Sequence, residues 1–408
     1  MTRPGPAIVF CMPGRGHFRR VLPLVAGLVE AGVPTHVFAE RLFAAEVEAV
    51  GGRFVDLFAG RPMDAADARS IPIPSRYVSF AGHYADSVTR EAAALRPAVV
   101  IHDTFAVIGW AVANHLGVPR VNVCAGHNAA PEPTLAALRE DPRVAIDPAC
   151  HEAVRALRER HGIAEASPFS YVTALSPDLN ICCEPPQFLR EADRAPFEPL
   201  VFFGSLSAAD VTSTPDGPAL FAGDAAARVY VSFGTVIWSY YEAQALGALT
   251  AIADAVAALA DTTALVSLGG SDRAGHIARL ARPNVRVEPY VDQRRALRDA
   301  TLFITHHGLN STHEAILQRV PMLSYPFFGD QPAMATRCQE LGLALPLAAA
   351  PRAAITIDTV IAAMACAVDE RARFAARLDE ARDWELATIR ARPAVIARIL
   401  EMASPYAM

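Results

Sequence analysis

Residues 290–331 read YVDQRRALRDATLFITHHGLNSTHEAILQRVPMLSYPFFGDQ and contain a complete strand, turn, helix and strand pattern. A short apolar run at 302–305 leads through polar residues and a glycine into a helical segment over 312–319. A second apolar run follows at 322–325. This succession is typical of parallel strands covered by helices, so the stretch predicts an α/β unit.

The same alternation extends outward to both ends of the chain. Further apolar runs lie at 7–12, 33–39, 97–101, 119–124, 229–233 and 264–268, and helical patterns lie at 21–31, 105–116 and 243–260. Continuous apolar strands joined by amphipathic helices indicate parallel sheets with both faces covered. The 408 residues are about twice the length of one domain. We predict an α/β fold of two facing, doubly wound, Rossmann-like domains, with a cleft where ligands meet the carboxyl ends of strands.

Composition suggests where the domains meet. Residues 207–226 are rich in Ser, Thr, Pro, Gly, Asp and Ala and lack apolar periodicity, which is typical of a linker. We therefore expect an N-terminal domain over 1–206 and a C-terminal domain over 227–385. The strongly helical end of the chain, 386–408, is expected to cross back and pack on the N-terminal domain.

The absence of lysine excludes several kinds of chemistry. All 37 residues counted as lysine or arginine are arginine, so neither a P-loop nor a lysine Schiff base can form. No Asp-x-Asp occurs, which disfavours metal-dependent chemistry on phosphosugars. The net charge is −6 with both signs mixed along the chain, which argues against a nucleic-acid partner.

The distribution of apolar residues predicts a cytoplasmic protein. No run reaches the roughly 18 apolar residues that cross a bilayer. The first run, 7–12, is shorter than the core of a signal peptide and leads into a Pro-Gly turn. The seven cysteines lack metal-type spacing, so we expect reduced thiols.

Two titratable residues follow strands in the N-terminal half. His17 ends the turn PGRGH at 13–17, and Asp103 follows the run at 97–101. An imidazole at a strand end can take a proton from a hydroxyl, and a carboxylate can orient the imidazole through its other nitrogen. The alternatives are that His17 caps local backbone and that Asp103 caps the next helix; His102 is a weaker substitute. The glycines of this turn make a poor dinucleotide fingerprint.

The segment THHGLNST at 305–312 predicts an anion site. It brings backbone amides and polar side chains to a helix N-terminus, where His306, Asn310 and Ser311 could donate hydrogen bonds to a diphosphate. The adjacent His306 and His307 also suggest a metal. Neighbours at a strand end point in opposite directions, so we predict no metal site.

Three further polar residues could bind hydroxyl groups. Glu314, in the first turn of the same helix, could accept from both hydroxyls of a ribose, or simply complement the helix dipole. Asp330 and Gln331, after the run at 322–325, could bind the paired hydroxyls of a hexose. The alternative for Asp330 is a helix N-cap.

These motifs resemble the UDP-glycosyltransferase superfamily of GT-B enzymes, and the resemblance spans nearly the whole chain. The superfamily includes bacterial macrolide and other natural-product glycosyltransferases. Its motifs are similar to Gly16-His17, to Ile101-His102-Asp103, to VSFGT at 231–235 and to the segment 290–331. The resemblance implies that His17 is the general base and Asp103 its partner. It implies donor-binding roles for Gly234, Thr235, Tyr290, Val291, Gln293, His306, Gly308, Asn310, Ser311, Glu314, Asp330 and Gln331.

Some residues depart from the family pattern. Tyr290 stands where tryptophan is common and Asp292 where proline is usual. Leu309 replaces the tryptophan of plant members, and Met334 stands where many relatives have asparagine. These departures leave the donor open between a UDP-sugar and a dTDP-sugar.

The resemblance implies an inverting glycosyltransferase that needs no metal or other cofactor. It would move a hexose or deoxyhexose from a UDP- or dTDP-sugar, bound by the C-terminal domain, to a hydroxyl of a hydrophobic natural product, bound by the N-terminal domain. Predicted acceptor contacts are Phe80, Tyr84 and Trp110, with ordinary core as the alternative for each. We expect a monomer or homodimer. The alternative functions are a nucleotide-sugar epimerase or hydrolase, or a partner protein without catalysis.

Overall fold

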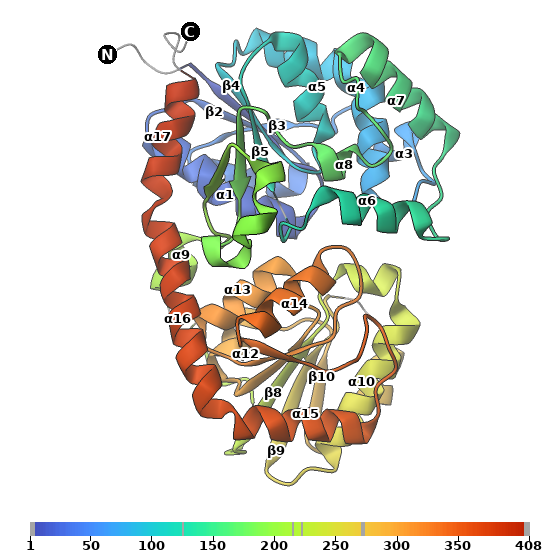
Figure 1. Ribbon diagram of the computed structural model, residues 1–408, viewed down its shortest axis with the longest axis vertical. Helices are drawn as coiled ribbons and strands as arrows, with labels where there is room; N and C mark the ends of the chain where they lie inside the picture. Colours follow the sequence, from blue (N-terminus) through green and yellow to red (C-terminus); the bar gives the residue numbers. More distant parts are fainter. Residues whose placement is uncertain (1–4, 125, 214–215, 222, 271–273, 404–408) are drawn as a thin grey trace. The chain divides into compact units, whose positions relative to one another are not determined.

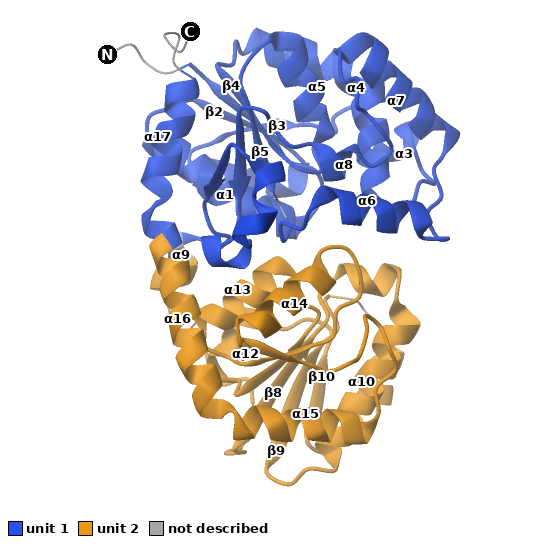
Figure 2. Ribbon diagram, in the orientation of Figure 1, with its two compact units in different colours: residues 1–207, 388–408 blue, residues 208–387 orange. Residues whose placement is uncertain are grey.

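The computed structural model describes residues 5–124, 126–213, 216–221, 223–270 and 274–403. The chain divides into two compact units (Figure 2). Unit 1 comprises residues 1–207 and 388–408, and unit 2 comprises residues 208–387.

Unit 1 is built on a parallel sheet of seven strands in the order β3-β2-β1-β4-β5-β6-β7 (Figure 1). The strands are β1 Ala7–Phe10, β2 Thr35–Ala39, β3 Arg53–Asp56, β4 Val99–Asp103, β5 Arg120–Cys124, β6 Leu179–Cys182 and β7 Leu200–Phe202. The central strands are buried along their whole length, as their continuous apolar runs predict. The strand order reverses between β1 and β4.

Helices cover the sheet of unit 1 on both faces (Figure 1). They are α1 Arg15–Glu30, α2 Ala44–Ala49, α3 Met63–Ala66, α4 Pro74–Ala94, α5 Val107–Leu116, α6 Pro131–Glu140, α7 Pro148–His161, α8 Ser170–Thr173 and α17 Arg392–Met402, with short 3₁₀ helices η1 Arg41–Phe43, η2 Pro186–Phe188, η3 Glu191–Asp193 and η4 Ala195–Phe197. α17 packs against α1, where a Cβ on Gly27 would lie 3.0 Å from Ile396. Arg392 also donates hydrogen bonds to the carbonyls of Phe203, Gly204 and Leu206.

Unit 2 repeats the plan with six parallel strands in the order β10-β9-β8-β11-β12-β13. The strands are β8 Ala227–Ser232, β9 Thr262–Ser267, β10 Val285–Glu288, β11 Leu302–Thr305, β12 Met322–Ser324 and β13 Ala344–Pro346. The helices are α9 Ala208–Thr212, η5 Val236–Ser239, α10 Glu242–Ala257, α11 Ala274–Leu280, α12 Gln293–Asp299, α13 Leu309–Leu317, α14 Gln331–Glu340, α15 Ile357–Asp369 and α16 Arg371–Arg390, whose last three residues belong to unit 1. Here the order reverses between β8 and β11.

The predicted α/β fold with two doubly wound, Rossmann-like halves is confirmed. The segment predicted as a linker, residues 207–226, differs from that expectation in part. Its described residues contain α9, and Arg294 of α12 donates to the carbonyls of Asp210 and Ser213 at 2.9 Å. These contacts attach the segment to unit 2. Residues 214–215 and 222 of that segment, and 404–408 of the predicted terminal helix, lie outside the described residues.

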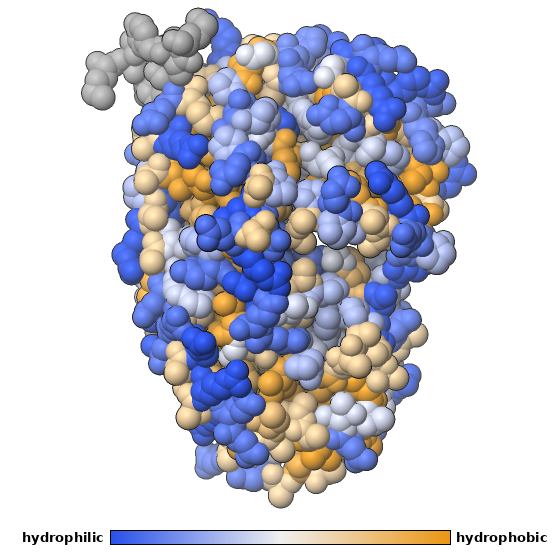
Figure 3. Space-filling view, in the orientation of Figure 1, coloured by the Kyte–Doolittle hydropathy of each residue, from blue (hydrophilic) through white to orange (hydrophobic). Residues whose placement is uncertain are grey.

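Apolar and polar residues are interspersed on the molecular face drawn in Figure 3. Large apolar side chains that are exposed in the described residues are Leu42, Ile71, Val236, Tyr290, Ile357 and Val368. Two of these, Val236 and Tyr290, follow the carboxyl ends of strands β8 and β10. None of the helices that the structure describes is long and apolar enough to span a bilayer.

Candidate active site

His17 and Asp103 lie together at the carboxyl edge of the sheet in unit 1. β1 and β4 are neighbours, and His17 lies in the first turn of the helix that follows β1, while Asp103 is the last residue of β4. Nδ1 of His17 is 3.0 Å from Oδ1 of Asp103, although the residues are 86 positions apart. Ligands of such sheets bind where the strand order reverses, which is where this pair lies.

The carboxylate of Asp103 is fully buried and has several hydrogen-bond partners. The backbone N–H groups of Phe105 and Met12 donate to its oxygens at 3.0 and 3.5 Å. Burial alone would raise the pKa of Asp103, but His17 and these N–H groups outweigh it and lower the pKa below its usual range. An ionised Asp103 fixes a proton on Nδ1 of His17, so that Nε2 is the basic atom. Asp103 does not cap α5, whose N-cap residue is Ala106.

An aromatic side chain covers one face of His17. The ring of Phe105 lies 4.2 Å from the imidazole, centroid to centroid, and Tyr77 lies 6.0 Å from Phe105. The hydroxyl of Tyr77 donates to the carbonyl of Pro13 in the turn before α1 at 3.1 Å. The side chain of His17 is still 23% exposed, so a substrate can reach it. Phe105 gave no signal in the sequence beyond its place two residues after Asp103.

The three predicted acceptor contacts differ in position. Phe80 and Trp110 are 0% and 3% exposed and belong to the hydrophobic core of unit 1, where Arg120 covers the Trp110 ring at 4.6 Å. Tyr84 lies at the margin of this core, and its hydroxyl donates to the carbonyl of Pro62 at 3.2 Å. For Phe80 and Trp110, the alternative of ordinary core describes their place.

His102 does not substitute for His17. Its Nδ1 lies 3.0 Å from the carbonyl oxygen of Asp103 and its Nε2 lies 3.3 Å from the guanidinium of Arg120. Complete burial, aided by the charge of Arg120, lowers the pKa of His102 to about 3. The neutral ring therefore braces the interior of the sheet.

In unit 2 the corresponding edge carries two glycines that enclose His306. β8 and β11 are neighbours, and His306 follows the last residue of β11. A Cβ on Gly234 or Gly308 would stand only 2.7 or 2.6 Å from Nε2 of His306. Gly234 also has a φ of +73°, which side-chain-bearing residues rarely adopt. Glycine at both positions therefore allows the imidazole to lie between the two loops.

His306 is a neutral group at this edge. Burial lowers the pKa of His306 to about 4, against smaller opposing effects of the Ser232 backbone and Asp330. At neutral pH the ring carries one proton and can donate one hydrogen bond without bringing a charge.

The N-terminus of α13 adds an anion-binding element next to His306. Its N-cap residue is Gly308, which has no side chain to satisfy the first N–H groups of the helix. The helix dipole places partial positive charge at this end, where Asn310 and Ser311 form the first turn. The exposed Thr235 follows Gly234 on the loop after β8. The combination suits a phosphate group.

Gln293, Ser311 and Glu314 form one hydrogen-bonded group beside this end of α13. The amide of Gln293 donates to the carboxylate of Glu314 at 2.7 Å and to the hydroxyl of Ser311 at 3.1 Å. Asp292 accepts from the backbone of Arg295 and caps α12, which explains an acidic residue at this place. Tyr290 is 71% exposed, as a ring that stacks on a base would be. Val291, next to it, is buried.

The loop after β12 leads to Asp330 and Gln331. Oε1 of Gln331 accepts from the backbone N–H groups of Phe327 and Phe328 at 2.9 and 3.3 Å, so part of this amide holds the turn. Asp330 is the N-cap residue of α14, but its side chain makes no cap hydrogen bond. Asp330 therefore occupies the N-cap position that the sequence offered as its alternative role, but its side chain does not cap the helix.

Arg352 also contacts this loop. Its backbone N–H donates to the carbonyl of Pro326 at 3.1 Å, and its guanidinium donates to the carbonyl of Phe327. The guanidinium also lies 4.8 Å from the centre of the Tyr241 ring. This residue gave no signal in the sequence, because its partners lie in two other loops.

His307 serves the interior of unit 2. Its Nδ1 is 3.2 Å from the hydroxyl of Thr312 and its Nε2 is 2.8 Å from the hydroxyl of Ser324. These contacts tie α13 to β12 and explain why a histidine accepts a φ of +61° here. Across the described ranges, no three His, Cys, Asp or Glu side chains are grouped as metal ligands.

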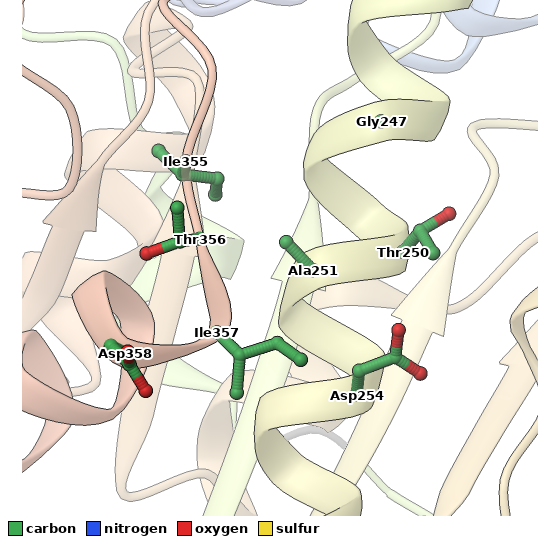
Figure 4. Close-up of a pocket in the computed structure, with 8 residues that line it drawn as sticks. All are labelled: Gly247, Thr250, Ala251, Asp254, Ile355, Thr356, Ile357 and Asp358. Atoms are coloured by element: carbon green, nitrogen blue, oxygen red, sulfur yellow. The ribbon is translucent and has the colours of Figure 1, made fainter.

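A separate hollow of about 550 Å³ lies between α10 and the segment that leads into α15 (Figure 4). Its lining includes Gly247, Ala251 and Ile357, with Asp254 at one side. Asp254 is bound by Arg282 at 2.6 Å. The rest of its lining is Thr250, Ile355, Thr356 and Asp358, and none of the predicted site residues belongs to it.

Comparisons with known proteins place these features in context. The model of the family "UDP-glucoronosyl and UDP-glucosyl transferase" matches residues 196–371. The "Uncharacterized UDP-glucosyltransferase YdhE" of Bacillus subtilis is 24% identical over 350 residues, 82% of this chain and 83% of that protein. The solved structure of the glycotransferase of kitacinnamycin has a TM-score of 0.73 at 24% identity and covers 97% of this chain and all of the other. The glycosyltransferase VinC, solved in complex with dTDP, has a TM-score of 0.65 at 17% identity, covering 97% and 99%.

Gly308→Ala is expected to weaken binding of UDP and of dTDP about tenfold, because the added Cβ would displace the His306 ring. The φ of −61° at this position suits alanine, so the backbone should not resist the change. Titration calorimetry measures the effect.

Gly247→Ala, in α10, is the matched control for that variant. A Cβ there meets nothing within 4 Å. It should bind nucleotide as the wild type does and gain up to about 1 kcal/mol of stability. Unchanged affinity in Gly308→Ala would contradict the assignment of His306.

Arg352→Ala is expected to lower the free energy of unfolding by about 1–3 kcal/mol, because a cation–π contact and a hydrogen bond to a loop carbonyl are lost. Urea unfolding measures it. Arg373→Ala removes an exposed pair with Glu370 on α16 and should change stability by less than about 0.5 kcal/mol. Equal losses in the two variants would refute the bracing role of Arg352.

Proposed function

Because this chain is a glycosyltransferase of the UDP-glycosyltransferase family, we propose that it transfers a hexose or deoxyhexose from a UDP- or dTDP-sugar to a hydroxyl of a hydrophobic small molecule. The observation that carries this proposal is the contact between His17 and Asp103 at the open edge of unit 1. The finer features, inversion and independence of a metal, belong to the same proposal.

In the proposed reaction, Nε2 of His17 removes the proton from the acceptor hydroxyl. The oxygen attacks the anomeric carbon from the face opposite the diphosphate, the bond to the diphosphate breaks, and an α-linked donor gives a β-glycoside. Asp103 stabilises the imidazolium as it forms. Phe105 and Tyr77 give the acceptor an apolar wall, which suits a hydrophobic aglycone.

Unit 2 would hold the donor. We assign the diphosphate to His306, Asn310, Ser311, Gly234, Gly308 and Thr235, the ribose to Glu314 and Gln293, the base to Tyr290 and Val291, and the sugar to Asp330 and Gln331. The neutral donors and the N-terminus of α13 would stabilise the leaving diphosphate. The solved complex of VinC with dTDP supports a nucleoside diphosphate as the class of ligand, and leaves UDP and dTDP as the two candidates.

The test incubates the protein with UDP-glucose and dTDP-glucose and a panel of polyphenols and macrolides, and follows release of nucleoside diphosphate. We expect release that depends on the acceptor and a product with a β-linkage by NMR. Release without acceptor would favour a hydrolase, and no release with any donor would favour a partner protein without catalysis.

His17→Ala is expected to lower kcat by about 10²–10⁴-fold with little change in donor affinity, because proton removal is lost while unit 2 is untouched. Asp103→Asn should lower kcat in a similar range, since it removes the charge that fixes the tautomer. His151→Ala, an exposed position on α7, is the control. Undiminished turnover in His17→Ala would sink the general-base role.

A further inference from the structure

α13 contains a histidine that the proposed reaction does not use. Nδ1 of His313 is hydrogen-bonded to Oε1 of Glu385, which lies on α16. Both side chains are 0% exposed, and both residues belong to unit 2. They are 72 positions apart, so no local pattern in the sequence predicts the pair. The pair is a fully buried polar connection between α13 and the last helix of unit 2.

The face of α16 that carries Glu385 is otherwise apolar within unit 2. Phe374, Leu378 and Ala381 are buried on α16. Together with Glu385 they are spaced by four, three and four residues, which places all four on one side of the helix. Apolar packing therefore already attaches α16 to its neighbours. An apolar side chain at position 385 would continue the same stripe, so attachment does not require a carboxylate there.

Stability alone does not explain the buried pair. A buried charge pair is seldom more stabilising than apolar side chains of similar size. Oε2 of Glu385 has no hydrogen-bond partner among the described residues, which adds a further cost. A polar contact does supply direction, because a hydrogen bond forms in one orientation of its partners, whereas apolar side chains pack in several. The pair therefore suits a role in fixing the orientation of α13.

Three consecutive residues of α13 are bound by three different elements. The hydroxyl of Ser311 accepts from Gln293 of α12 at 3.1 Å. The hydroxyl of Thr312 lies 3.2 Å from Nδ1 of His307, in the loop after β11. His313 is bound by α16. Because successive residues of an α-helix point about 100° apart, these contacts hold α13 from three directions.

The rotation of α13 about its axis decides where its side chains reach. The tip of a side chain lies about 5–6 Å from the helix axis, so a rotation of about 10° moves it by about 1 Å. A displacement of this size is enough to weaken hydrogen bonds to a ligand. Asn310, Ser311 and Glu314, which we assign to the diphosphate and the ribose, all lie on this helix.

We propose that His313 and Glu385 are positioning residues for the nucleotide, which hold α13 in the rotation that directs its N-terminus and Glu314 at the diphosphate and the ribose. The inference rests on the proposed function, because it takes the donor site from there. Neither residue touches the nucleotide. Their effect therefore belongs to donor binding, and the apolar contacts of α16 remain without them.

The experiment measures the Kd of UDP and of dTDP by titration calorimetry, the steady-state constants, and unfolding in urea. Glu385→Ala should raise Kd about three- to tenfold and should raise KM for the donor more than it lowers kcat. Glu385→Gln should keep Kd within about twofold of the wild type, because its amide oxygen accepts from His313. Asp379→Ala is the matched control. It removes an exposed pair between α16 and Arg319, which follows α13, and should leave Kd unchanged.

The outcomes separate positioning from stability and from the proposed function. A purely structural role would lower the free energy of unfolding and leave the Kd of the folded protein unchanged, so that result in Glu385→Ala overturns the proposal. An equal rise of Kd in Asp379→Ala overturns it as well. Failure of the wild type to bind either nucleotide contradicts the proposed function itself.

A second variant decides if Glu385→Ala does not fold. The double variant His313→Leu/Glu385→Leu replaces the buried pair by apolar side chains, which should keep the protein folded. Its Kd should still rise about three- to tenfold, because the directional contact is lost. A folded double variant that binds nucleotide as the wild type does would refute the positioning role.

Discussion

A doubly wound parallel sheet stays open at one place, where its strand order reverses, because the helices that follow the two central strands turn to opposite faces. Unit 1 reverses between β1 and β4, and unit 2 between β8 and β11. In unit 1 this brings His17 against Asp103. In unit 2 it brings His306 between two glycines. Neither arrangement needs long loops, since each residue lies within a few positions of a strand end.

Because the chain has no lysine, the proposed diphosphate site of unit 2 would rely on neutral groups. A leaving diphosphate would meet an imidazole whose pKa burial lowers to about 4, and the N–H groups of α13. Neutral donors are weaker than an ammonium group in water, but burial reduces the screening that weakens them. In the proposed donor site, the close fit of His306 against Gly234 and Gly308 would matter for binding, because the ring is only 9% exposed.

Sequence reasoning placed side chains well where they follow a strand end, and less well where their position depends on which side of a helix faces inward. The fold and the proximity of His17 and Asp103 follow from continuous apolar runs, since parallel strands finish at a common edge. Phe80 and Trp110 are aromatic residues on helices, and only packing decides that they belong to the core. The contacts of Arg352 and the pairing of His127 with Glu184 join loops distant in the chain, and no short-range pattern encodes such contacts.

The histidines of this chain show how surroundings divide one side chain among several roles. His102 and His306 have the pKa lowered to about 3 and 4 because burial opposes their charged form. His307 uses both nitrogens to brace α13. A general base needs an acidic partner to stabilise the imidazolium and enough exposure to reach substrate and release a proton. His17 meets both conditions at 23% exposure, whereas His127 has the partner at only 6%. Exposure therefore makes His17, rather than His127, the histidine suited to the proposed proton removal.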